Sequence, residues 1–185
     1  HTITLTGLPQ GQHVQFIGKV KVGTNPFQQS SPIFSQTKDG YEDNGTMSIA
    51  RNLPLGLVSS GTYRGNVDAN LHDASDMDYY YIDLTSESEV QFAMQYPVQS
   101  ISPASDYDLY LYNAQGTLLA SITATGLSSK SITQKLAAGR YYVKVSVRYQ
   151  NPLSFPYSLG VYAQNTFIPP VVVDESHYGS QDSAS

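Results

Sequence analysis

Two oxygen-rich segments hold the side chains that could do chemistry with a cation. Their carboxylate and amide groups are Asp39, Glu42, Asp43 and Asn44, followed by Asp68, Asp73, Asp76 and Asp78. Calcium takes about six to eight oxygen ligands, so two such loops that converge can bind it without the spacing of an EF-hand. The alternative is that these residues cap turns on solvated loops.

A second carboxylate pair, Asp106 and Asp108, opens the segment SDYDLYLY. Two residues apart on a strand, these carboxylates would share one face, as a pair of catalytic acids does. Nothing in the sequence sets the pKa of one apart from that of the other, and the pair stands where a strand begins. We therefore interpret it as the anchor of a loop.

Other catalytic motifs are missing from the sequence. It contains no G-x-S-x-G nucleophile elbow, no H-E-x-x-H zinc motif and no glycine-rich phosphate loop. The histidines lie mostly in loops or near the ends, and we interpret His72 as an ordinary loop residue. With no cysteine, the chain has neither disulfides nor thiolate metal sites. The chain is therefore predicted not to be an enzyme.

The composition and charge of the chain limit the kinds of partner that it can bind. Of the 185 residues, 40 % are hydrophobic, enough for a packed core, but only 14 % are charged. The net charge is −5 and no run of Lys or Arg occurs, which argues against nucleic-acid binding. No apolar stretch is long enough to span a membrane. Fifteen tyrosines without tryptophan are typical of a β-rich chain with tyrosine on its surface.

Period-two alternation recurs along the chain, and helical periodicity is almost absent. The alternating runs are Val14–Val22, Tyr79–Leu84, Val90–Tyr96, Tyr107–Tyr112, Arg140–Arg148 and Tyr157–Tyr162. Turn residues such as Asn113 and Gly116 separate them, and one helical turn is expected at Thr46–Leu53. The pattern predicts an all-β, antiparallel sandwich.

Composition also divides the chain into three parts. Residues 1–37 are expected to form a leading strand pair and a linker, either as extra strands of the sandwich or as the end of a preceding domain. Residues 38–163 would be the sandwich, and residues 164–185 a short strand and a polar tail. Because the chain begins at His1 without an initiator Met or a signal peptide, we expect a mature or excised fragment of a longer protein.

Four segments, in order, resemble the bacterial pre-peptidase C-terminal domain, the family that includes the collagen-binding domains of clostridial collagenases. They are YEDNGTMSIA with LPLG (41–50 and 53–56), DMDYYYIDL (76–84), SDYDLYLYNAQG (105–116), and GRYYVKV with PYSL (139–145 and 156–159). Each motif alone is unspecific, and the order of the four carries the resemblance. Residues 1–37 lie outside it.

The resemblance implies a jelly-roll-like β-sandwich that is appended to a secreted bacterial protease and does not catalyse. The expected partner in cis is the parent protease domain, the expected location is extracellular, and the expected state is a monomer. Relatives bind calcium at the acidic opening segment and the Asp-rich loop. By matched position, the calcium ligands here would be Glu42, Asn44 and Asp78, followed by Asp76 and Asp73.

A binding surface for an insoluble polymer is predicted on the sheet. If the valines of the run Arg140–Arg148 face the core, then Tyr142, Lys144 and Arg148 face outward, with Tyr110 and Tyr112 on a neighbouring strand. Exposed tyrosines beside cations form a platform suited to collagen or a polysaccharide, and collagen-binding relatives use strand tyrosines in this way. Alternatively, tyrosine simply favours half-exposed strands. Two other functions stay open: a carbohydrate-binding module, or a folding and secretion domain without a ligand.

Overall fold

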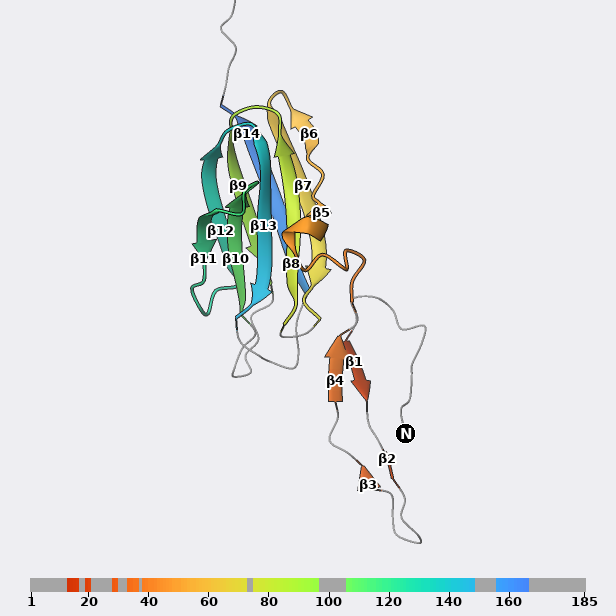
Figure 1. Cartoon of the computed structure of the whole chain (residues 1–185). Coiled ribbons are helices and arrows are strands. Elements are labelled where there is room, and N and C mark those ends of the chain that lie inside the picture. The colour runs from red at the N-terminus through yellow and green to blue at the C-terminus, as the bar shows by residue number, and fades with distance from the viewer. Residues whose placement is uncertain are drawn as a thin grey trace, which may run out of the picture.

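The computed structural model describes residues 38–72, 75–96, 106–148 and 156–166, and the strand backbones at 13–16, 19–20, 28–29 and 33–36. Two five-stranded sheets lie face to face, so the prediction of an all-β sandwich is confirmed (Figure 1). The first sheet has the order β11 (Leu118–Ile122), β10 (Tyr107–Asn113), β13 (Gly139–Val147), β8 (Met77–Leu84) and β5 (Arg51–Asn52). The second has the order β12 (Ser129–Leu136), β9 (Ser88–Gln95), β14 (Pro156–Asn165), β7 (Thr62–Asn70) and β6 (Gly56–Ser59).

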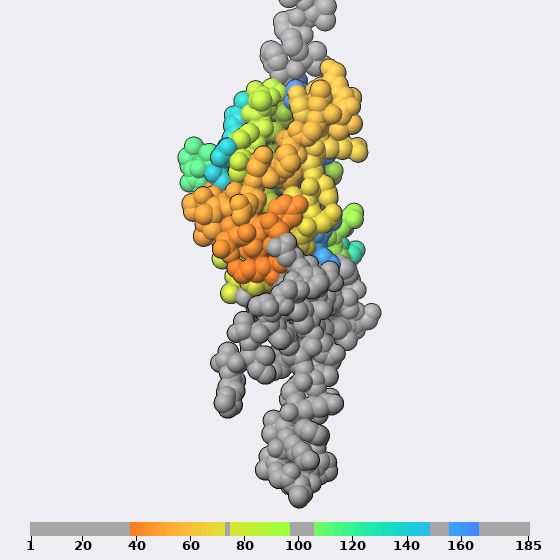
Figure 2. Space-filling model, turned by 90° about the vertical axis from the view of Figure 1, so that its right-hand side faces the viewer, coloured from red at the N-terminus to blue at the C-terminus, as the bar shows by residue number. Residues whose placement is uncertain are grey.

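All neighbouring strands in these sheets are antiparallel except β5 and β8, which run parallel. The expected helical turn is a short 3-10 helix at Met47–Ile49. Figure 2 shows the segment that contains it (orange) lying along one side of the sandwich next to β7 (yellow). Residues 38–46, at the start of the same segment, form part of the candidate functional site.

Four further strands lie within residues 1–37. β1 (His13–Phe16) pairs with β4 (Ile33–Gln36), and β2 (Lys19–Val20) pairs with β3 (Gln28–Gln29). None of these four described strands belongs to either five-stranded sheet. The division of the chain at residue 37 stays a prediction.

Alternation along each strand builds the core between the sheets. In β8 the inward positions are Asp78, Tyr80, Ile82 and Leu84, all buried, whereas the residues between them are half-buried or exposed. The facing strand β9 contributes buried apolar side chains in the same rhythm. Burial of this kind supplies about 1.5–3 kcal/mol for each large apolar side chain.

Tyrosine is a core residue here as well as a surface one. Tyr80, Tyr96, Tyr107 and Tyr157 are each at most 5 % exposed, so the expectation of surface tyrosines is wrong for these four. The Tyr96 hydroxyl donates to Asp106 Oδ1 at 2.7 Å, and the Tyr80 and Tyr157 hydroxyls share a hydrogen bond of 2.9 Å. A buried tyrosine needs such a partner for its hydroxyl.

The Asp106 and Asp108 pair is held by a buried ammonium. Lys130 of β12 is 2 % exposed, and its Nζ lies 2.9 Å from Asp106 Oδ1 and 3.5 Å from Asp108 Oδ1. The same ammonium donates to the carbonyl of Tyr107. A buried Lys is tolerated only when it is paired in this way. The arrangement agrees with the interpretation of the two aspartates as an anchor.

Two strand glycines provide a matched test of this packing. A Cβ at Gly65 would clash with the side chain of Leu53 and lie 2.6 Å from the carbonyl oxygen of Pro54, whereas at Gly160 the nearest atoms lie 3.8 Å away. We expect Gly65→Ala to lower the free energy of unfolding by about 1–3 kcal/mol. Gly160→Ala should change it by less than about 0.5 kcal/mol. Urea denaturation measures both, and equal stabilities would contradict the packing described here.

Candidate functional site

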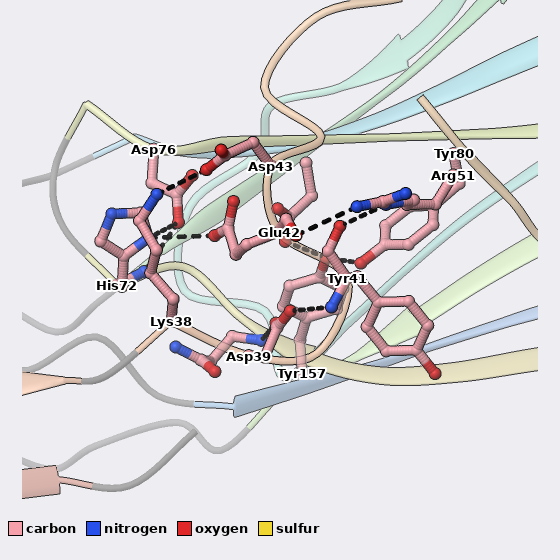
Figure 3. A network of polar contacts seen from close by, with 12 residues as sticks. Lys38, Asp39, Tyr41, Glu42, Asp43, Arg51, His72, Asp76, Tyr80 and Tyr157 are labelled. Carbon is pink, nitrogen blue, oxygen red and sulfur yellow. Dashed lines mark hydrogen bonds and ion pairs between the residues drawn. The ribbon is translucent and has the colours of Figure 1, made fainter. Parts of the chain in front are cut away.

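An acidic site forms where the segment 38–46 meets the end of β7 and the loop before β8 (Figure 3). Asp39 fixes the first segment, because its Oδ2 accepts from the backbone N–H of Asn70 at 2.7 Å and its Oδ1 from that of Tyr41 at 2.8 Å. The carbonyl of Asn44 accepts from the backbone N–H of Tyr79 at 2.9 Å. These bonds tie the two oxygen-rich segments to the sandwich.

Three ligand atoms converge in this site. Those of Glu42, His72 and Asp76 all lie within 4.8 Å of one another. The Nδ1 of His72 is 3.0 Å from Glu42 Oε1 and 2.6 Å from Asp76 Oδ2 (Figure 3). The sequence interpretation of His72 as an ordinary loop residue missed these contacts.

Asn44 and Asp78 are fully buried. Within the described part of the chain, neither the amide oxygen nor the amide nitrogen of Asn44 has a hydrogen-bond partner, and Asp78 Oδ1 has none either. The other oxygen of Asp78 accepts from the Tyr157 hydroxyl. A buried polar atom left without a partner costs about 1–3 kcal/mol, so these oxygens need a partner such as a bound cation or an ordered water, and the amide nitrogen of Asn44 needs an acceptor.

Several carboxyl groups share this end of the sandwich, and His72 is the basic side chain in contact with two of them, Glu42 and Asp76. Burial, and next the charge of Asp76, raise the pKa of Glu42. Burial raises the pKa of Asp78 to about 8. The hydrogen bond from Tyr157 lowers this pKa, and the charge of Asp76 raises it further. Negative charge that is this poorly solvated favours a bound cation.

The lysine and the arginine of this region, Lys38 and Arg51, are paired with other groups. Lys38 pairs with the exposed Asp43, its Nζ lying 2.6 Å from Oδ1. Arg51 donates to the backbone carbonyls of Tyr41 at 2.8 Å and Glu42 at 3.0 Å (Figure 3). Among the described residues, no lysine or arginine forms a salt bridge with Glu42, Asp76 or Asp78.

The structure brings two of the five predicted calcium ligands, Glu42 and Asp76, together around His72. Asn44 and Asp78 belong to the same two segments but not to this three-residue group, and each has a buried oxygen without a hydrogen-bond partner among the described residues. Asp73 lies outside the described residues. The residues fit a hard cation, and calcium itself stays a prediction.

A second candidate surface covers the outside of the first sheet. In the register of β8, β13 and β10, Tyr79, Lys144 and Tyr110 form one row across the strands, and Tyr81, Tyr142 and Tyr112 form the next. We call these six residues with Arg140 the tyrosine face. Its ring centroids lie 6.3–6.4 Å apart for the pairs Tyr79–Tyr112, Tyr81–Tyr142 and Tyr110–Tyr112.

Two cations lie over these rings. Lys144 Nζ is 4.0 Å from the ring centroid of Tyr110, and the guanidinium of Arg140 is 3.9 Å from that of Tyr81. Arg140 also forms two 2.7 Å hydrogen bonds with the carboxylate of Asp83, which hold it in place. Burial lowers the pKa of Lys144, as expected for an ammonium packed among aromatic rings.

The structure thus brings Tyr110, Tyr112, Tyr142 and Lys144 together as the sequence analysis expected. Arg148 differs, because its guanidinium lies 3.4 Å from Asp108 Oδ1 and donates to the carbonyl of Thr123. Tyr79 and Tyr81 were missed as members of the face. The signal for them was the triplet Tyr79–Tyr81, whose middle residue is in the core.

No family model matches this sequence, and a search of curated proteins finds no relative. Several solved structures match part of this chain. The pre-peptidase C-terminal domain of collagenase from Bacillus anthracis is 16 % identical, with 60 % of this chain and 93 % of that chain covered and a TM-score of 0.45. A periplasmic inhibitor of g-type lysozyme from Aeromonas hydrophila is 12 % identical, covering 62 % and 97 %, with a TM-score of 0.42.

A third solved structure is TmCBM61 in complex with β-1,4-galactotriose, which is 12 % identical, with 68 % and 97 % covered and a TM-score of 0.32. At these identities and scores, what the three proteins bind says nothing about this chain. In the described part of the chain, no helix is long and apolar enough to cross a membrane.

Asp78 makes stability depend on pH when no metal is bound. Its pKa is about 8 in the folded chain and about 3.9 in an unfolded one, so the folded state holds the proton more tightly. In the presence of a chelator, the free energy of unfolding should therefore fall as pH rises from about 4 to about 8. Asp78→Asn should flatten this slope in urea denaturation series.

The matched control is Asp83→Asn on the outer face of the same strand. Arg140 lowers the pKa of Asp83, so its contribution is lost only when pH falls below the ordinary carboxyl range. The Asp83 variant should keep the slope between about pH 4 and 8. If Asp78→Asn left the slope unchanged, the raised pKa of the buried Asp78 carboxyl would be contradicted.

Proposed function

We propose that this chain is a non-catalytic accessory module of a secreted bacterial protease, stabilised by calcium, that docks on a polymeric protein such as collagen. The observation that carries the proposal is the tyrosine face, where five rings and two cations gather on one outer sheet surface. The attachment to a protease and the secretion rest on the resemblance of the four ordered motifs.

The tyrosine face suits a collagen-like polymer by its chemistry. Collagen consists of polyproline-II chains rich in proline, whose rings and outward carbonyls alternate along the strand. Aromatic surfaces bind such chains well because a polyproline-II chain is already ordered and loses little conformational entropy on binding. A tyrosine also provides a hydroxyl that can donate to a carbonyl. The rings of Tyr79, Tyr110 and Tyr112 form a continuous surface for this contact.

Calcium in this proposal has a structural role. Carboxylates of Glu42, Asp76 and Asp78 and the amide oxygen of Asn44 would hold the ion, which supplies positive charge to oxygens that otherwise have no partner. The ion would join the segment 38–46 to β8. It takes part in no reaction.

Calcium should raise the thermal stability of the chain. We expect a saturating concentration to increase Tm by roughly 5–15 °C relative to the chelated protein, because the ion binds only the folded state. Glu42→Gln should reduce this increase, and Glu89→Gln on the exposed side of β9 should leave it intact. Calorimetry with calcium, zinc and EDTA measures the effect.

Zinc belongs in that experiment because one histidine and two carboxylates can also bind it. A calcium response that is absent, or smaller than the zinc response, would overturn the calcium assignment.

The tyrosine face should determine retention on insoluble collagen. We expect the double change Tyr110→Ala and Tyr142→Ala to weaken retention at least ~10-fold, since buried aromatic anchors dominate binding energy. Thr133→Ala, which removes an exposed side chain from β12 in the opposite sheet, is the control and should bind like the parent. Pull-down on collagen against cellulose and chitin measures this, and equal retention of both variants would refute docking by this face.

A further inference from the structure

The outer face of the second sheet carries a shallow groove of about 660 Å³. Its lining includes Arg64 and Asn66 of β7, Gln91 and Ala93 of β9, and Gly160 and Tyr162 of β14. We call it the amide groove. It lies on the side of the sandwich opposite to the tyrosine face, so neither the metal site nor that face accounts for it.

Gly160 at the floor of the groove needs an explanation. A glycine inside a strand weakens it, and usually marks a bulge, a close approach of another backbone, or the place where a ligand comes near. β14 pairs with β7 and β9 in unbroken register through Gly160, which excludes a bulge. A Cβ at this position would make only ordinary contacts of 3.8 Å, which excludes a close backbone approach. The open floor at Gly160 leaves room for a ligand to approach the sheet.

The side chains in the row across the sheet through Gly160 are small, and those in the neighbouring row are larger. Asn66, Gly160 and Ala93 are register partners, while Arg64, Tyr162 and Gln91 form the neighbouring row. The Arg64 guanidinium lies 5.4 Å from the ring centroid of Tyr162, which builds one wall of the groove. A low floor beside this wall accommodates a chain that lies on the sheet.

The hollow continues along β14 toward its first residue. A second depression of about 560 Å³ lies at that end of the sandwich, lined by outward residues such as Asp68, Gln95 and Ser158 and also by the core tyrosines Tyr96 and Tyr157. Asp68, Ser158 and Gln95 are register partners in the row that follows Gly160. Tyr162 and Pro156 are six positions apart, or about 20 Å of strand, so the surface matches an extended polymer better than a compact molecule.

The polar groups of this surface are mostly neutral and face solvent. Gln91, Gln95 and Asn66 are exposed, and within the described part of the chain the side chains of Gln91 and Arg64 have no hydrogen-bond partner. A side-chain amide offers donors and an acceptor side by side, which matches a hydroxyl group that both donates and accepts. One cation, Arg64, and one anion, Asp68, line the two hollows, so the lining carries no net charge.

We propose that the amide groove binds a segment of a neutral polysaccharide. The amides of Asn66, Gln91 and Gln95 would hydrogen-bond its hydroxyl groups, and the ring of Tyr162 would contact the apolar face of a sugar. An anionic polymer would need clustered cations, which this lining lacks. A proline-rich extended peptide is bound by surfaces of several aromatic rings, whereas Tyr162 is the one aromatic residue among those that line the groove.

Native affinity electrophoresis of the full chain tests the proposal. The gels contain mixed-linkage β-glucan, arabinoxylan, β-1,4-galactan or dextran as neutral polysaccharides, with polygalacturonate and gelatin as the anionic and protein polymers. We expect retardation by at least one neutral polysaccharide, unchanged between ~0.05 and ~0.5 M NaCl because no charges are paired.

Gly160→Val fills the floor of the groove, where a Cβ would meet its nearest atoms at 3.8 Å, and should weaken that retardation at least ~10-fold. Gln91→Ala removes one amide without adding volume and should weaken it as well, which covers the case in which the valine disturbs the sheet. Ser121→Val on the exposed side of β11 in the first sheet is the matched control and should run like the parent.

Three results would overturn the proposal. They are no retardation in any neutral gel, retardation that Gly160→Val and Gln91→Ala leave unchanged, and retardation only by polygalacturonate or gelatin that these variants abolish. Collagen retention by the tyrosine face is measured separately with Tyr110→Ala and Tyr142→Ala, so the failure of one site does not decide the other.

Discussion

The hydroxyl of Tyr157 joins the two sheets, and the rest of the site depends on it. It donates to Asp78 and shares a 2.9 Å hydrogen bond with the hydroxyl of Tyr80, so a residue of the second sheet binds two residues of the first. Tyr157 and Tyr80 are buried, and a buried hydroxyl without partners would destabilise the sandwich. This contact fixes Asp78 at the end of the sheet, where the segment 38–46 and the loop before β8 meet.

Strand alternation gives the two outer faces different chemistry from one architecture. On β8, β10 and β13 most outward positions in the middle of the sheet are tyrosines, whose rings contact one another across the strands beside Lys144 and Arg140. On β7, β9 and β14 a row of Asn66, Gly160 and Ala93 leaves a hollow beside the wall formed by Arg64 and Tyr162. The core between the sheets separates the two surfaces, so each can change without repacking the other.

Strands in which apolar and polar residues alternate strictly were predicted from the sequence. Strands in which this alternation is interrupted were missed. β8, β10 and β13 begin and end within a few residues of the expected runs. β12 was missed because its inward position Lys130 is polar, and a buried, paired lysine cannot be told from a surface one by pattern. β7 was missed because glycine and asparagine interrupt its apolar residues.

The candidate site was predictable as far as its residues are close in sequence or matched by a motif. The acidic residues were found in this way. His72 was not, because its partner Glu42 lies thirty positions away and only the fold brings them together. The buried tyrosines were missed for a related reason, since composition does not reveal which hydroxyls have partners in the opposite sheet.

The chain enters and leaves the sandwich at opposite ends of β14. Asp39 bonds Asn70, the register partner of Pro156 at the start of β14, whereas Asn165 ends the same strand about 30 Å away (Figure 1). A pulling force between the flanking segments would therefore act along the strands. Because β14 has hydrogen-bonded neighbours on both sides, its ladders would be sheared all at once rather than opened one bond at a time.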